Sequence, residues 1–292
     1  MEPVVVNGVT IGGAGGTCVM GVLNVTPDSF SDGGRYVSPS AAAMAGLALV
    51  RAGAHILDVG GESTRPDAAP VAAADEAARV LPVIRALRAA GCAAAISIDT
   101  VKAEVADAAL AAGADIVNDV AGGAHDPDLL RVVARRGAVV VLGHLRGAPG
   151  AGMMKDVAFV DVVAEVGDEL WARVAAARAA GVAPGRIVID PGLGFGKLLE
   201  HNLALIQGLG ALRARVGRPV LVGPSRKRFL GELTGIAEPA ARDFPTAAAI
   251  TACILAGADA VRVHAVAELV AVVKVADALR KAAPGHAYQG AA

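Results

Sequence analysis

The stretch "RAGAHILDVGGESTRP", Arg51 to Pro66, contains the pattern that decides the fold. An Ala-rich segment ends at Gly53, and glycine readily takes the left-handed conformation that ends a helix. The apolar run over 55–61 has the composition of a buried strand, and a polar loop follows it. The stretch is therefore one unit of helix, glycine, strand and polar loop.

The same unit recurs along the chain. The strand candidates are residues 18–25, 55–61, 94–100, 115–121, 139–144, 186–192, 219–225 and 260–266. Helices are expected to begin near residues 38–40, 74 and 101, after 127, and near 162, 199, 242–246 and 267. Eight strands that each precede a helix predict an α/β fold, a (β/α)8 TIM barrel, with a short N-terminal β-hairpin within residues 4–17. Because no linker or composition break interrupts the 292 residues, we expect one domain over residues 1–292.

The overall composition limits the class of partner. A net charge of -1 and a pI near 6.6 argue against a nucleic-acid-binding face or a cationic membrane-binding face. The three cysteines lie far apart and lack a C-x-x-C pattern, so neither a disulfide framework nor a zinc knuckle is indicated. Neither a secretory signal nor a membrane-spanning run is evident. The sequence predicts a cytoplasmic protein that binds small molecules.

Polar residues come late in every predicted strand, where a TIM barrel carries its active site. They are Asn24, Glu62, Asp99, Asn118, His144, Asp190, Ser225 and His264. Two carboxylates and a carboxamide, Asp99, Asp190 and Asn118, suit a flat heterocycle that offers several N–H donors and a carbonyl. Helix capping by the two aspartates is an alternative. A divalent metal cluster is another, although the histidine partners of a hydrolase site are not arranged around them.

Two polar loops add candidate ligands. In "GGESTRP", 60–66, Thr64 and Arg65 are suited to an anion, whereas Glu62 is expected to hold the loop backbone. The stretch "DPGLGFGK", 190–197, is not a phosphate-binding loop, because proline replaces the first glycine of that motif and leucine follows the lysine. Its glycines would instead allow close approach of backbone to a ligand, with Phe195 as an apolar wall.

The last two strands predict an anion site. The segment "GPSRKRFLG", 223–231, places Ser225, Arg226 and Lys227 after the seventh strand. In "VRVH" the side chains of Arg262 and His264 alternate with valines and therefore point the same way. Since the N-terminal N–H groups of the next helix would also attract an anion, we expect a phosphate or pyrophosphate here.

These motifs, in this order, closely resemble those of the dihydropteroate synthase family. The matching stretches are "NVTPDSFSDGG", "DVGGESTRP", "SIDT", "VNDV", "DPGLGFGK", "SRK" and "RVH", and the resemblance extends from Met20 to about Lys281. The resemblance implies a TIM-barrel enzyme of folate biosynthesis. Members of the family condense 6-hydroxymethyl-7,8-dihydropterin pyrophosphate with p-aminobenzoate, forming 7,8-dihydropteroate and pyrophosphate.

The resemblance also implies a role for each candidate residue. The pterin would be held by Asp99, Asn118, Asp190 and Lys227. The pyrophosphate would be held by Asn24, Thr64, Arg65, Arg262 and His264, with Mg²⁺ near Asn24. The pocket for p-aminobenzoate, or for a sulfonamide that mimics it, would be formed by Thr64, Pro66, Phe195, Ser225 and Lys227. The loops over 27–38 and 63–74 would close over the site. Asp32, Lys227 and Arg262 would be catalytic in an SN1-like reaction, with Asp32 stabilising the pterin cation. Members of the family are usually homodimers.

Three departures from the family pattern are visible. Gly143 stands where members usually have methionine, Ala265 follows His264 where aspartate is common, and Pro245 replaces alanine or glycine. None of the three removes a ligand that the resemblance implies. Two alternative functions are a catalytically silent pterin-binding paralogue and a corrinoid-linked methyl-tetrahydrofolate methyltransferase, although the latter would not need the "ESTRP" and "SRK" motifs.

Overall fold

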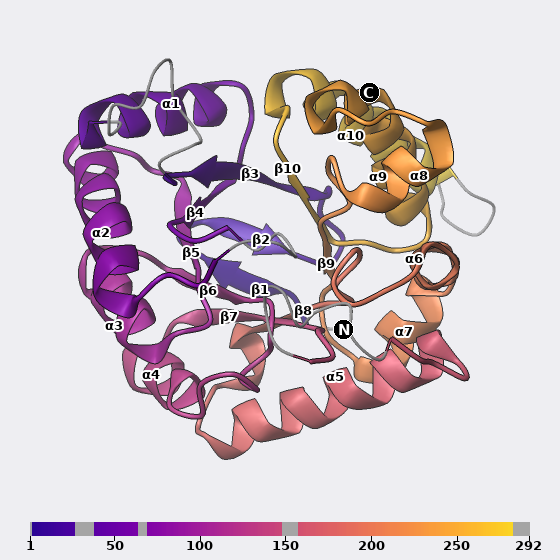
Figure 1. Ribbon diagram of the computed structural model, residues 1–292, viewed down its shortest axis with the longest axis horizontal. Coiled ribbons are helices and arrows are strands. Elements are labelled where there is room, and N and C mark those ends of the chain that lie inside the picture. Colours follow the sequence, from indigo (N-terminus) through magenta and orange to yellow (C-terminus); the bar gives the residue numbers. More distant parts are fainter. Residues whose placement is uncertain (1, 27–37, 64–68, 148–156, 283–292) are drawn as a thin grey trace.

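Eight parallel strands form a barrel with helices around it, as predicted (Figure 1). The computed structural model describes residues 2–26, 38–63, 69–147 and 157–282. The strands are β3 (Cys18–Asn24), β4 (Ile56–Gly60), β5 (Ala95–Asp99), β6 (Ile116–Asp119), β7 (Val139–Gly143), β8 (Ile187–Asp190), β9 (Leu221–Val222) and β10 (Ala260–Val263). They follow the order β8-β7-β6-β5-β4-β3-β10-β9. A single bridge between Ile189 and Val220 connects the two ends of this sheet and closes the barrel.

The helices surround the strands and match most of the predicted starts. They are α1 (Pro39–Arg51), α2 (Ala73–Ala89), α3 (Ala103–Ala111), α4 (Leu129–Arg136), α5 (Val162–Ala179), α6 (Leu199–Gln207), α7 (Leu209–Val216), α8 (Arg228–Thr234), α9 (Asp243–Leu255) and α10 (Val266–Ala282), with short 3-10 turns at Pro184–Arg186 and Pro239–Arg242. Helices α7 and α8 were not anticipated: the chain turns at Gly208 instead of continuing α6, and α8 occupies the loop after β9. Within the described ranges, no helix has the length and apolar composition of a membrane-spanning segment.

The N-terminal hairpin closes one end of the barrel. Strands β1 (Val4–Val6) and β2 (Val9–Ile11) pair antiparallel, which confirms the predicted hairpin, and they lie across the middle of the view in Figure 1. Their inward side chains join the first inward-facing residues of the barrel strands in one buried apolar cluster. Its members are Val4, Val6, Ile11, Cys18, Met20, Ile56, Ala95, Ile116, Val139, Val141, Val188, Leu221 and Ala260. The opposite end, where the strands finish, is the end that carries polar side chains.

Candidate active site

Strand register brings the predicted site residues to one edge of the barrel. Asn24 pairs with Gly60, Gly60 with Asp99, and Asp99 with Asn118, so the ends of four neighbouring strands are level. Asp190 is the last residue of β8, and Arg262 lies in β10. Residues up to 238 positions apart in the sequence therefore meet, because parallel strands present their carboxyl ends on the same side.

A buried carboxylate that the sequence analysis missed, Asp58, organises this edge. Its Oδ2 accepts hydrogen bonds from Arg262 Nε at 2.6 Å and from Asn118 Nδ2 at 3.1 Å. Arg262 Nη2 also donates to Asp99 Oδ2 at 2.8 Å. Asp58 is fully buried in the middle of an apolar strand, two residues before Gly60. That position was the available signal, since a carboxylate is almost never fully buried unless it is paired.

Burial dominates the electrostatics of the two predicted pterin aspartates. It raises the pKa of Asp99, against the opposing effect of Arg262, and it raises the pKa of Asp190, against the opposing effect of Lys227. Asp190 Oδ1 accepts a hydrogen bond from the Gly192 N–H at 2.7 Å. The capping alternative is wrong, because the N-cap positions of the helices that follow are Lys102 and Leu198.

Lys227 and Phe195 lie together beside Asp190. The Lys227 ammonium sits 3.8 Å from the centroid of the Phe195 ring and donates to the Leu193 carbonyl. Burial lowers the pKa of Lys227, while Asp190 acts in the opposite direction. The arrangement places a hydrogen-bond donor, an aromatic wall and a carboxylate at one position.

Ser225 and His264 form a second pair at the same edge. Ser225 Oγ lies 2.9 Å from His264 Nδ1, and burial lowers the pKa of His264 to about 3, with Arg262 contributing in the same direction. His264 is therefore neutral at neutral pH and can give an anion a hydrogen bond but not a charge. Arg226 does not join this pair, since its guanidinium makes two 2.8 Å hydrogen bonds to Asp243 of α9.

Four predicted ligands fall outside the described residues. They are Asp32, Thr64, Arg65 and Pro66. The residues beside the second loop are described, and they confirm the structural role expected of Glu62, whose Oε1 accepts the Val71 N–H at 2.9 Å. Lys102 forms salt bridges with both Glu62 and the buried Glu76. These contacts anchor the loop at both of its ends.

Asn24 is compatible with the magnesium ion that the resemblance implies. It is half-buried at the end of β3, and its Oδ1 lies beside Gly60. Over the described ranges, no group of three or more His, Cys, Asp or Glu side chains could hold a metal ion. Mg²⁺ usually keeps several waters and binds one or two protein oxygens together with substrate phosphates, so one amide oxygen is a suitable ligand only alongside a diphosphate.

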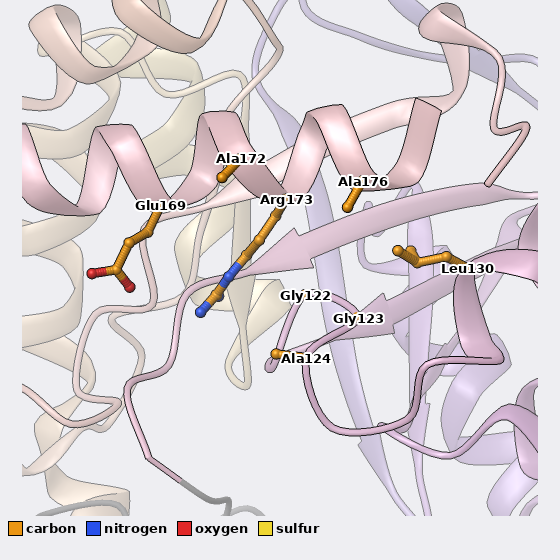
Figure 2. A pocket seen from close by; sticks show the side chains of 8 residues that line it. All are labelled: Gly122, Gly123, Ala124, Leu130, Glu169, Ala172, Arg173 and Ala176. Atoms are coloured by element: carbon orange, nitrogen blue, oxygen red, sulfur yellow. The ribbon is translucent and has the colours of Figure 1, made fainter. Parts of the chain in front are cut away.

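Gly143 has no room for a longer side chain. A Cβ added there would lie 2.6 Å from Val120 Cα, so the backbone of the loop after β6 occupies the space that a methionine would need. Next to this loop, a surface cavity of about 360 Å³ separates it from α5 (Figure 2). Figure 2 shows Arg173 pointing from α5 toward the loop, and its two Nη atoms donate to the carbonyls of Gly143 and Leu145. The arginine that lines this cavity therefore binds backbone carbonyls.

Comparison with known proteins agrees with this geometry. Residues 20–264 match the family described as pterin binding enzyme. The chain is 49% identical over 271 residues to dihydropteroate synthase of Mycobacterium leprae, covering 91% of this chain and 94% of that protein. It is similar to two solved structures of Xanthomonas albilineans dihydropteroate synthase. The structure with 4-aminobenzoic acid has a TM-score of 0.86 and 43% identity, over 96% of this chain and 98% of that chain. The structure with 7,8-dihydropteroate has a TM-score of 0.81 and 42% identity, over 92% of this chain and 95% of that chain. The chain belongs to the dihydropteroate synthase family of pterin-binding enzymes.

Proposed function

We propose that this chain is a dihydropteroate synthase, which joins 6-hydroxymethyl-7,8-dihydropterin pyrophosphate to p-aminobenzoate and releases pyrophosphate. The observation that carries the proposal is the cluster at the strand ends, where Asp99, Asn118 and Asp190 lie with Lys227 and Arg262. Relatives with the same name and high identity over nearly the whole chain support the same activity. A catalytically silent paralogue or a corrinoid-linked methyltransferase would not need this complete set of side chains.

The pterin would be held by complementary hydrogen bonds. Asp190 and Asn118 would bind the amino and imino edge of the ring, and Lys227 would donate to its acceptor atoms. Asp99 would accept a further ring N–H. Because burial disfavours both carboxylates in their charged form, the N–H groups of the pterin would offset part of that desolvation with charge-assisted hydrogen bonds.

The pyrophosphate would lie between the ends of β3 and β10. Arg262 supplies charge, His264 supplies a neutral N–H, and Asn24 supplies an amide oxygen for Mg²⁺, with Thr64 and Arg65 added from the second loop. Bound magnesium would neutralise charge on the departing pyrophosphate. The C–O bond to the pyrophosphate breaks first, the electron pair leaves with the oxygen, and Asp32 stabilises the pterin cation that remains.

p-Aminobenzoate would attack this cation from a pocket framed by Phe195, Ser225 and Lys227, with Thr64 and Pro66 from the second loop. The amine nitrogen forms the new C–N bond and loses its proton. If the loops complete this pocket only around bound pyrophosphate, p-aminobenzoate must bind last.

Pyrophosphate release in the presence of both substrates tests the activity. We expect release that depends on both, together with tight calorimetric binding of p-aminobenzoate only after pterin and magnesium pyrophosphate have bound. Binding of pterin without release would indicate a silent paralogue, and methyl transfer to a corrinoid would indicate the methyltransferase. Tight binding of p-aminobenzoate to the free protein would contradict the ordered mechanism.

The anion assignment has its own test. His264→Ala should weaken the pyrophosphate-bearing pterin by about tenfold or more, since a hydrogen bond to a charged group is worth about 1.5 to 3 kcal/mol. A pterin that lacks the pyrophosphate should bind almost as before, because the lost donor faces only the anion. Equal weakening of both ligands, measured by calorimetry, would assign His264 a structural role.

We further propose that the protein acts as a homodimer in the cytoplasm. Exposed apolar side chains on α8 and α9, Leu233, Phe244 and Leu255, support a protein interface, and Phe244 is 91% exposed. The cysteines are free and buried, which suits a reducing compartment. Light scattering of the parent and of Phe244→Glu tests the dimer, which the charged variant should dissociate.

A further inference from the structure

Lys197 is a buried lysine that the proposed reaction does not use. It ends the loop over 191–197 and is only 4% exposed. Its Nζ lies 3.0 Å from the Phe195 carbonyl oxygen, 3.0 Å from His144 Nδ1 and 3.3 Å from the His144 carbonyl oxygen. When Lys197 is protonated, its ammonium group has three N–H donors and no acceptor, so these three partners match it completely.

His144 links Lys197 to Glu169 of helix α5. Its ring is fully buried, and Nε2 lies 2.9 Å from Glu169 Oε2. Burial lowers the pKa of His144 to about 4, so the ring is neutral at neutral pH. A lysine that donates to Nδ1 requires the proton on Nε2, which then points at Glu169. Arg146 holds the other oxygen of Glu169. The chain of donors therefore has one direction, from Lys197 to the carboxylate on α5.

The loop held by Lys197, residues 191–197, also contacts two proposed ligands of the site, Asp190 and Lys227. Gly192 donates to Asp190, Leu193 accepts from Lys227, and the Phe195 ring lies under the Lys227 ammonium. The loop packs closely on His144, which directly follows the neighbouring strand β7. A Cβ added at Gly192, whose φ is +68°, would lie 1.9 Å from the His144 carbonyl oxygen. A shift of this loop would move the aromatic wall and a lysine together.

We propose that Lys197 is a positioning residue for the p-aminobenzoate pocket: it ties the Phe195 carbonyl to His144 and thereby sets the place of the Phe195 ring and of Lys227. The inference rests on the proposed function, because it concerns the second substrate of that reaction. Burying an ammonium is costly unless hydrogen bonds replace its water. A purely packing role would be served as well by an apolar side chain, whereas the three acceptors require a donor.

The variant Lys197→Met tests the proposal, because methionine is similar in length and donates no hydrogen bond. We expect KM for p-aminobenzoate to rise by about tenfold or more, since small misplacements of binding groups have large effects. KM for the pterin pyrophosphate should rise by a smaller factor. Of its proposed ligands, only Asp190 and Lys227 contact this loop, and the others belong to other segments of the chain. The split between the two KM values is what a general loss of stability would not produce.

Arg213→Met is the matched control. Arg213 is a partly buried cation that makes two hydrogen bonds to the buried Asp259, just before the start of β10 and far from the strand ends. This control should lower Tm and leave both KM values unchanged.

A second pair of variants keeps the test decisive if Lys197→Met does not fold. His144→Gln retains an acceptor toward Lys197 and a donor toward Glu169, whereas His144→Leu retains neither. We expect the leucine variant to raise KM for p-aminobenzoate and the glutamine variant to recover most of the parent value.

The outcomes separate this inference from the proposed function. If the parent protein releases no pyrophosphate, the proposed function fails, and the pocket is then measured by calorimetric binding of p-aminobenzoate with pterin and magnesium pyrophosphate present. If the parent is active and Lys197→Met leaves KM for p-aminobenzoate unchanged, or raises both KM values equally, the positioning role is overturned. Equal KM values for the two His144 variants would overturn it as well.

Discussion

The barrel interior has an apolar half, which the hairpin closes, and a charged half at the carboxyl ends of the strands. The same strands form both halves, but their contributions to stability are opposite. On β4, Ile56 belongs to the apolar cluster that the hairpin closes, whereas Asp58, two residues later and on the same face, belongs to the charged cluster. The first half removes apolar surface from water, which stabilises the fold. The second half buries charges whose desolvation opposes folding and leaves Asp58 Oδ1 and Ser97 Oγ without a hydrogen-bond partner among the described residues. Stability and ligand binding are thus assigned to different layers of one barrel.

The largest expected effect breaks the apolar half. Ile56→Ala should lower the free energy of unfolding by about 2 to 5 kcal/mol, because the closed barrel cannot collapse into the cavity that the truncation leaves. Urea unfolding measures the loss. Both KM values of the folded variant should match the parent, and a large change in either would show that the two halves are not separate.

The second effect breaks the charged half. Asp190→Asn should weaken a pterin by about tenfold to a hundredfold, since a hydrogen bond to a charged group contributes about 1.5 to 3 kcal/mol. Its free energy of unfolding should stay near the parent value, because the variant removes a buried charge without creating a cavity. Calorimetry with a pterin and urea unfolding test both statements, and unchanged pterin affinity would remove Asp190 from the site.

The third effect is a dependence of stability on pH. Burial lowers the pKa of Lys197 from 10.5 to about 7, so between these values the unfolded state binds more protons than the folded one. The free energy of unfolding therefore contains a contribution that rises with pH from about 7 toward 10.5, by at most about 1.4 kcal/mol per pH unit. Lys197→Met should lack that contribution in urea unfolding at pH 7, 8 and 9. Parallel profiles for the variant and the parent would mean that the lysine titrates normally.

The smallest effect sharpens the comparison at the hairpin. Val4 and Val6 are buried against the barrel, but Val5 between them is 53% exposed. Val5→Ala should change the free energy of unfolding by no more than about 0.5 kcal/mol, the usual range for surface substitutions. A loss as large as that of Ile56→Ala would show that both faces of the hairpin stabilise the fold.

Most of the fold and the position of the site could be predicted from the sequence. Strand and helix periodicity, with glycines at the helix ends, are local signals, and they placed all eight barrel strands. The rule that active sites lie at the carboxyl ends of barrel strands then selected Asp99, Asn118 and Asp190 without any knowledge of their contacts. The split of α6 and α7 escaped prediction, because both segments have helical composition.

The pairing of charges was decided only by the tertiary structure. Asp58 meets Arg262 across 204 positions of sequence, Arg226 turns to Asp243 instead of the anion pair, and Lys197 meets His144 from a neighbouring strand end. The sequence by itself determined which residues lie at the strand ends, because that depends on the period of each strand. It could not determine which of them neutralise one another, since a hydrogen bond depends on distances of a few ångströms that only the closed barrel sets.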